Sequence, residues 1–159
     1  MLKIVFDADG LIKLAHTGIL AKVNERCLIS NQVFNETVVE GKKRLYPDAL
    51  IIEDLIKQQK MIVQKVIVKK IEGYGIGEIS TLTLFMKEKA DVIVSDDRKF
   101  LVYLDNLDVP FIIPTEFIVG LAMSNRITKE DGREALKNIK SFVRLEQYTQ
   151  ALHTLGGKI

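Results

Sequence analysis

Residues 90–100 have the sequence ADVIVSDDRKF, in which an apolar, β-branched run ends in two adjacent acids. Such a short apolar run between charged residues is typical of a buried strand. A second run of this kind lies near the start of the chain, at residues 3–7 (KIVFD), and it also ends in an acid. Both runs are followed by helical patterns, so each strand places an acid where the strand gives way to a helix.

The rest of the chain alternates between the same two patterns. Further strands are predicted at 27–29, 61–71 and 109–113. Helices are predicted to begin near residues 9, 17, 31, 47, 77, 98, 114 and 128, with Thr128 opening a capping box. Strands separated by helices predict a three-layer α/β/α fold around a central, mostly parallel sheet.

Composition limits the possible classes of protein. The chain has 159 residues and is 47% hydrophobic and 28% charged, which indicates a single globular domain over residues 1–159. Its net charge of +2 gives no general argument for nucleic-acid binding, so a polyanion would have to be held by local charge. Apolar runs are far shorter than the ~20 residues of a membrane span, and the first residues do not resemble a secretory signal. We therefore expect a cytoplasmic protein that does not engage a membrane.

Four separated segments supply acids to one edge of the predicted sheet. Asp7, Asp96 and Asp97 follow strands directly, and the carboxyl ends of parallel strands form the ligand-binding edge of such sheets. Glu36 interrupts an otherwise inward-facing helical stripe, and Glu78 lies in the first turn of the helix that leads to the Asp96 strand. Clustered carboxylates repel unless a cation neutralises them, and Mg²⁺ and Mn²⁺ prefer carboxylate oxygens.

Each acid also has a purely structural explanation. Asp97 could only cap the following helix, Glu78 could complement a helix N-terminus, and Glu36 could be a solvated helix position. We expect Asp9 to cap the first helix. Asp7 is harder to explain structurally, because Asn or Ser would end that strand equally well.

Basic residues follow the acidic pair directly. Arg98 and Lys99 lie where the backbone phosphate of a bound nucleic acid would pass, so they are candidate substrate-binding residues. The single cysteine, Cys27, excludes an intramolecular disulfide and a cysteine-based zinc site.

These segments together resemble the PIN domain, a metal-dependent ribonuclease fold found in many toxins of toxin–antitoxin pairs. The carrying segments are residues 5–12 (VFDADGLI), Glu36, Gly77-Glu78, residues 92–100 (VIVSDDRKF) and residues 109–117 (VPFIIPTEF). Asp9 departs from the pattern, which commonly has Ser, Thr or Asn there. The resemblance implies an RNA-cleaving enzyme that uses Mg²⁺ or Mn²⁺, a homodimer and an antitoxin partner. Its implied metal ligands and catalytic residues are Asp7, Glu36, Glu78, Asp96 and Asp97, since either of the two adjacent acids can match the last acid of the pattern.

Two other hypotheses fit part of the sequence. Residues 6–10 (FDADG) also resemble the nucleophile motif of haloacid dehalogenase-type phosphatases, which would make Asp7 a nucleophile and Asp9 a general acid. That hypothesis gives no role to Glu36 or Glu78. A PIN-like module that binds RNA or a partner without cutting is the other alternative, and the presence of all the motif acids disfavours it.

Overall fold

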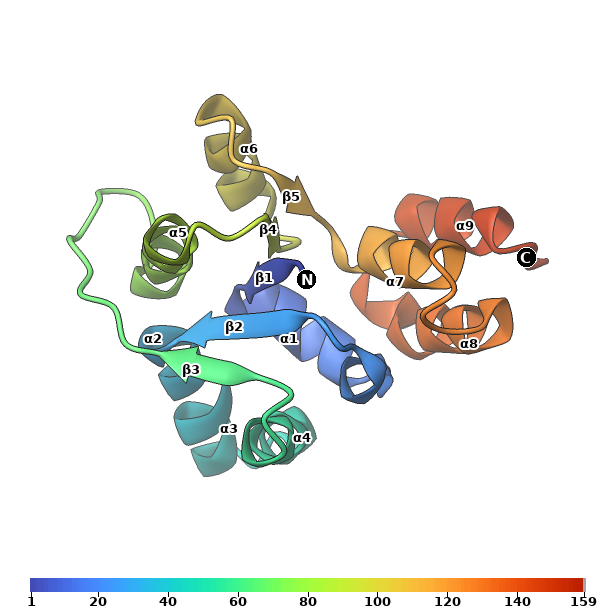
Figure 1. Cartoon of the computed structure of the whole chain (residues 1–159), viewed down its shortest axis with the longest axis horizontal. Coiled ribbons are helices and arrows are strands. Elements are labelled where there is room, and N and C mark those ends of the chain that lie inside the picture. The colour runs from blue at the N-terminus through green and yellow to red at the C-terminus, as the bar shows by residue number, and fades with distance from the viewer. Residues whose placement is uncertain (159) are drawn as a thin grey trace.

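Residues 1–158 are described by a computed structural model, in which helices cover both faces of a five-stranded parallel sheet (Figure 1). The strand order is β3-β2-β1-β4-β5, and each neighbouring pair is parallel. The strands are β1 (Lys3–Phe6), β2 (Arg26–Ser30), β3 (Ile62–Gln64), β4 (Val92–Val94) and β5 (Phe111–Ile112). The predicted three-layer α/β/α fold is confirmed.

The helices connect the strands and complete the chain after β5. They are α1 (Ala8–Ala15), η1 (Ile19–Lys22), α2 (Asn31–Phe34), η2 (Asn35–Val39), α3 (Glu40–Lys43), α4 (Pro47–Lys57), α5 (Ile76–Glu88), α6 (Arg98–Asn106), α7 (Pro114–Met123), α8 (Lys129–Ile139), η3 (Lys140–Phe142) and α9 (Leu145–Thr154). Ser30 and Thr128 accept backbone hydrogen bonds as the N-caps of α2 and α8. In the part of the chain described, none of the helices combines the length and apolar character that a membrane span requires.

Alternate residues of each strand supply two separate cores. In β1, Ile4 and Phe6 pack into the larger core, which contains residues of α1, α4, α7, α8 and α9. Val5 points to the opposite face and packs with residues of α5 and α6. This alternation is the period of two that a strand imposes on its side chains. It makes β1, in the middle of the sheet, buried on both faces.

The sheet has a topological switch point between β1 and β4. From β1 the chain crosses to β2 on one side, whereas β4 is followed by β5 on the other side. The crossovers leave these two central strands in opposite directions, which opens a crevice beyond their carboxyl ends. Asp7 follows β1 and Ser95 follows β4, so both lie at this crevice.

The predicted strand over 61–71 is wrong beyond residue 64. Ser30, the last residue of β2, pairs with Gln64, and the chain then turns into α2, so later residues have no strand to pair with. Side chains take over instead: the Val66 N–H donates to Asn31 Oδ1 at 3.0 Å, and its carbonyl accepts from Gln32 Nε2 at 3.2 Å. Residues after β3 are therefore held by α2 rather than by the sheet.

Two helix predictions also need correction. The helix expected to begin near residue 17 is only the 3₁₀ turn η1, because Gly18 adopts φ +74° and Thr17 Oγ1 accepts a hydrogen bond from the Ile19 N–H. No helix was predicted to begin after the one at residue 128, yet α9 packs against α7 and α8 and contributes Tyr148 and Leu152 to the larger core.

Candidate active site

Asp7 is the most deeply buried acid at the switch point. It caps α1, and its Oδ1 accepts a hydrogen bond from the Gly10 N–H at 2.7 Å, while its Oδ2 accepts one from the hydroxyl of Ser95. Only 3% of the surface of Asp7 is exposed to solvent. Burial raises the pKa of Asp7 to about 7, although both hydrogen bonds oppose the increase. The expectation that Asp9 caps α1 is wrong, because Asp7 fills that position.

Gly10 allows α1 to lie against the end of β4. A Cβ atom at this position would lie 2.7 Å from the Val94 carbonyl oxygen and 3.1 Å from Asp7 Oδ1. The Val94 carbonyl and the buried Asp7 carboxylate cannot move easily to make room for a side chain. The close approach of α1 to β4 therefore requires glycine at position 10. Asp7 and the residues after β4 are brought together by this contact.

The two adjacent acids after β4 point to different neighbours. Asp97 caps α6 by accepting from the Phe100 N–H at 3.0 Å, and its charge raises the pKa values of both Asp7 and Glu78. Asp96 instead accepts a 2.7 Å hydrogen bond from Lys13 Nζ. The structural explanation of Asp97 as a cap is therefore correct, and the same side chain also faces the other acids.

Glu36 lies in η2, a π-helical turn that widens the helix between α2 and α3. Wide turns of this type re-aim side chains and are frequent at functional sites. The residue is exposed as a whole, but its carboxylate lies against α5: a Cβ atom on Gly77 would come within 2.2 Å of Glu36 Oε1. Burial and the charge of Glu78 raise the pKa of Glu36. Gly77 thus provides the space that this carboxylate occupies.

Glu78 stands between the other acids, in the first turn of α5. Burial and then the charge of Asp97 raise its pKa, against a backbone hydrogen bond from Gly75 and the charge of Lys99. Its Oε2 is buried and has no hydrogen-bond partner within residues 1–158. A buried carboxylate oxygen without a partner is costly, and a bound cation or water would remove that cost.

The structure therefore connects four predicted acids as a series of neighbours, from Asp7 to Asp97, Glu78 and Glu36. Within residues 1–158, no three His, Cys, Asp or Glu side chains are arranged as a ready metal site. The donor chemistry nevertheless fits a hard divalent cation, because the series offers carboxylate oxygens and includes the unpartnered Glu78 Oε2.

The ammonium group of Lys99 is bound to the loop before α5 and is not available as an unpaired cation beside the acids. Its ammonium donates to the Gly73 carbonyl and sits 5.0 Å from the centroid of the Tyr74 ring, which itself stacks on Tyr103 at 4.4 Å. Lys99 therefore fastens the loop that leads into α5 and Glu78. Arg98, at the first position of α6, is exposed to solvent.

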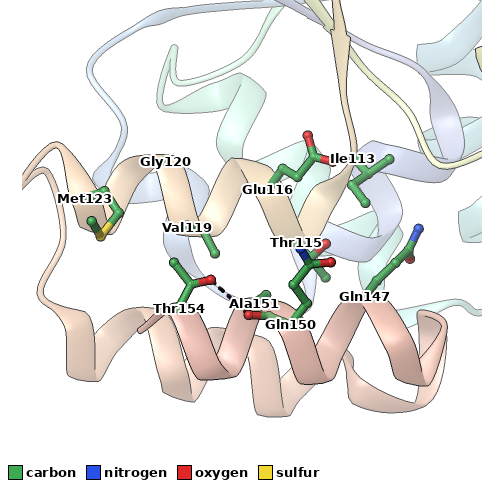
Figure 2. A pocket seen from close by; sticks show the side chains of 10 residues that line it. All are labelled: Ile113, Thr115, Glu116, Val119, Gly120, Met123, Gln147, Gln150, Ala151 and Thr154. Atoms are coloured by element: carbon green, nitrogen blue, oxygen red, sulfur yellow. Dashed lines mark hydrogen bonds between the residues drawn. The ribbon is translucent and has the colours of Figure 1, made fainter. Parts of the chain in front are cut away.

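Four residues to which the sequence analysis gave no role also contribute to the site: Lys13, Gly77, Ser95 and Glu116. Glu116, in the first turn of α7, is near Asp96, whose charge adds to burial in raising the Glu116 pKa. It also lines a cavity of about 450 Å³ between α7 and α9, where Figure 2 shows it at the end of α7 next to Ile113. A signal existed for Ser95, since it directly follows a strand end, but the partners of the others depend on the tertiary packing.

The fold and these residues define an α/β protein with acidic side chains at the switch point of a parallel sheet. The chain belongs to the PIN domain family, whose model matches residues 3–156. PIN domains are generally nucleases. A solved structure, a PilT N-terminus domain protein from the archaeon Sulfolobus solfataricus, has the same fold with a TM-score of 0.54 and 16% identity, covering 72% of this chain and 89% of that one. No curated protein matches the chain.

Proposed function

We propose that this protein is an endoribonuclease that depends on Mg²⁺ or Mn²⁺. The observation that carries the proposal is the series of acids at the β1–β4 switch point, with Glu78 Oε2 buried and unpartnered in the described chain. Asp7, Glu36, Glu78 and Asp97 would hold the ion. When bound, a divalent cation supplies Lewis acidity, which polarises a phosphoryl oxygen and activates water.

The residues of this chain have separate tasks in the proposed reaction. Asp7 is held by Gly10 and Ser95, each of which donates a hydrogen bond to one of its carboxylate oxygens and so fixes the orientation of the side chain. Asp97 is fixed in the same way by the Phe100 N–H. Glu78 lies near Asp97, and its unpartnered Oε2 would be a ligand oxygen for the ion. Arg98, exposed beside these acids, would contact an RNA phosphate.

The arrangement supports the nuclease over the phosphatase hypothesis. A phosphatase of that type would need Asp9 as a general acid, but the Asp9 carboxylate bonds to Lys13 Nζ at 3.2 Å. It would also leave Glu36 and Glu78 without a role, although α5 and η2 bring them together. A binding-only PIN module is disfavoured because it gives no role to Glu78 Oε2, which is buried and has no hydrogen-bond partner in the described chain.

The test compares two kinds of substrate and three variants. A panel of RNAs and a small phosphomonoester should be incubated with the protein, with and without Mn²⁺, after circular dichroism confirms folding. We expect metal-dependent RNA cleavage that Asp7→Asn abolishes, and greater damage from Glu78→Gln than from Asp9→Asn. Phosphate release from the monoester, or the reverse order of the two variants, would favour the phosphatase. Full cleavage by a folded Asp7→Asn protein would refute the site.

The family resemblance extends the proposal to biological partners. It implies a homodimer and an antitoxin that restrains the enzyme. Light scattering on the purified chain tests the first, and co-purification with the product of a neighbouring gene tests the second.

A further inference from the structure

Lys13 forms a second charged cluster beside the proposed metal site. This residue of α1 places its Nζ 2.7 Å from Asp96 Oδ2 and 3.2 Å from Asp9 Oδ2. The side chains of Lys13 and Asp96 are largely buried, with 16% and 6% of their surface exposed. Buried ion pairs of this geometry are strongly held, and removal of one partner leaves an uncompensated charge.

The carboxylates of this cluster carry more negative charge than the single ammonium group of Lys13 can neutralise. Asp96 Oδ1 is buried and has no hydrogen-bond partner within residues 1–158. Glu116 is near enough to Asp96 for the two charges to interact. Two carboxylates therefore contact one ammonium group and a third lies near Asp96, whose nine-tenths-buried side chain has one oxygen without a partner.

The sequence pattern agrees with this arrangement. Asp9 stands where the resemblance expects Ser, Thr or Asn, and Asp96 is an acid in addition to the cap residue Asp97. Lys13 contacts both of these extra acids and lies four residues after Asp9, on the same face of α1. The extra acids and the lysine thus form one unit, which adjoins the other acids because Asp9 lies near enough to Asp7 for their charges to interact.

We propose that Lys13 takes the place of a second divalent cation. Its ammonium group is a permanent internal cation that keeps Asp9, Asp96 and Glu116 from binding metal, so that the edge of the sheet binds a single ion at the neighbouring acids. The inference rests on the proposed function for that first ion. Lys13 is a positioning residue here, because it acts through the two aspartates.

The test counts bound Mn²⁺ in the full-length protein by isothermal titration and by electron paramagnetic resonance. We expect about one ion per chain for the wild type and about two for Lys13→Met, since loss of the ammonium group frees two carboxylates. Lys13→Arg retains the charge and should bind one. Lys22→Met is the matched control, because it removes an exposed lysine whose ion-pair partner at 3.2 Å is Asp131, which is none of these acids.

Further variants separate a second site from a general change in the protein. Adding Asp96→Asn to Lys13→Met should return the count to one. If Lys13→Met does not fold, Lys13→Gln removes the charge but keeps a hydrogen-bond donor, and we expect the same second ion. Removal of an ion pair with only a structural role would lower stability without adding a metal.

The outcomes distinguish the two claims. A wild type that binds no Mn²⁺ refutes the proposed function together with this inference. A wild type that binds two ions, or a folded Lys13→Met protein that still binds one, overturns the inference alone and leaves the first site standing.

Discussion

The hydroxyl of Ser95 donates a hydrogen bond to the carboxylate of Asp7, joining the ends of the two central strands. Ser95 is fully buried, and its backbone N–H pairs with Ile112 of the next strand, so its position is set by the sheet. The contact holds one oxygen of Asp7 while Gly10 holds the other. Asp7 is therefore oriented by backbone geometry before any ligand binds.

Replacement of Ser95 by Ala should weaken catalysis without removing a proposed ligand. Loss of a residue that orients a metal ligand commonly costs about 10- to 100-fold in activity or metal affinity. The hydrogen bond also favours the ionised form of Asp7, so its loss should raise the Asp7 pKa and move the acidic limb of the pH–rate profile upward. Ser95→Thr, which keeps the hydroxyl, is the control. An unchanged profile for a folded Ser95→Ala protein would contradict this role.

The raised pKa of Asp7 predicts how stability depends on pH in metal-free protein. The folded state holds the proton up to about pH 7, whereas the unfolded chain loses it near 3.8, so ionisation of Asp7 destabilises the fold as pH rises through this range. Asp7→Asn keeps the cap without the charge. Its free energy of unfolding should exceed that of wild type above pH 7, by on the order of 4 kcal/mol at most, with no advantage below about pH 4.

Urea denaturation in EDTA at several pH values measures this difference. Asp131→Asn is a control of opposite sign, because Lys22 and the cap Thr128 lower the pKa of Asp131. That variant should lose stability at neutral pH and match the wild type in acid. A constant difference between Asp7→Asn and wild type across the whole range would contradict the burial of an ionisable Asp7.

Gly77→Ala should impair the site while leaving every acid in place. The new Cβ would meet Glu36 Oε1 at 2.2 Å, and the flexible end of Glu36 must then leave its present position against α5. Alanine is favoured over glycine within a helix by up to about 1 kcal/mol, so stability should not fall. We expect weaker Mn²⁺ binding, on the order of tenfold. Gly120→Ala in α7 faces open space and should change neither property.

The two adjacent acids should respond differently to amide substitution. Asp97→Asn keeps a good N-cap, so its melting temperature should stay close to wild type while cleavage falls on the order of 10²-fold or more. Asp96→Asn breaks the buried pair with Lys13, so its melting temperature should fall, with a smaller loss of cleavage. Thermal melts and initial rates on the same RNA measure both effects. A larger rate loss for Asp96→Asn would exchange their assigned roles.

Much of the architecture was predictable from local patterns. The apolar runs at residues 3–7 and 90–100 gave the central strands, because a strand buried on both faces must be apolar throughout. The acids that follow them had to lie at one edge, since parallel strands end on the same side. The order β3-β2-β1-β4-β5 then put Asp7 beside Ser95. The strand prediction failed at residues 65–71. These residues have a high strand propensity, but no neighbouring strand is present for them to pair with.

The tertiary structure decided which neighbours each acid contacts. Asp96 and Asp97 are adjacent aspartates that the sequence alone does not distinguish. The packing of α1 and α6 turns Asp96 toward Lys13, and it turns Asp97 toward Asp7 and Glu78. Glu36 gains its place from a π-helical turn and from the missing side chain of Gly77. Spacing along the chain specifies which residues reach an edge of the sheet. Which charges they meet there depends on contacts between segments tens of residues apart, and these form only when the helices pack.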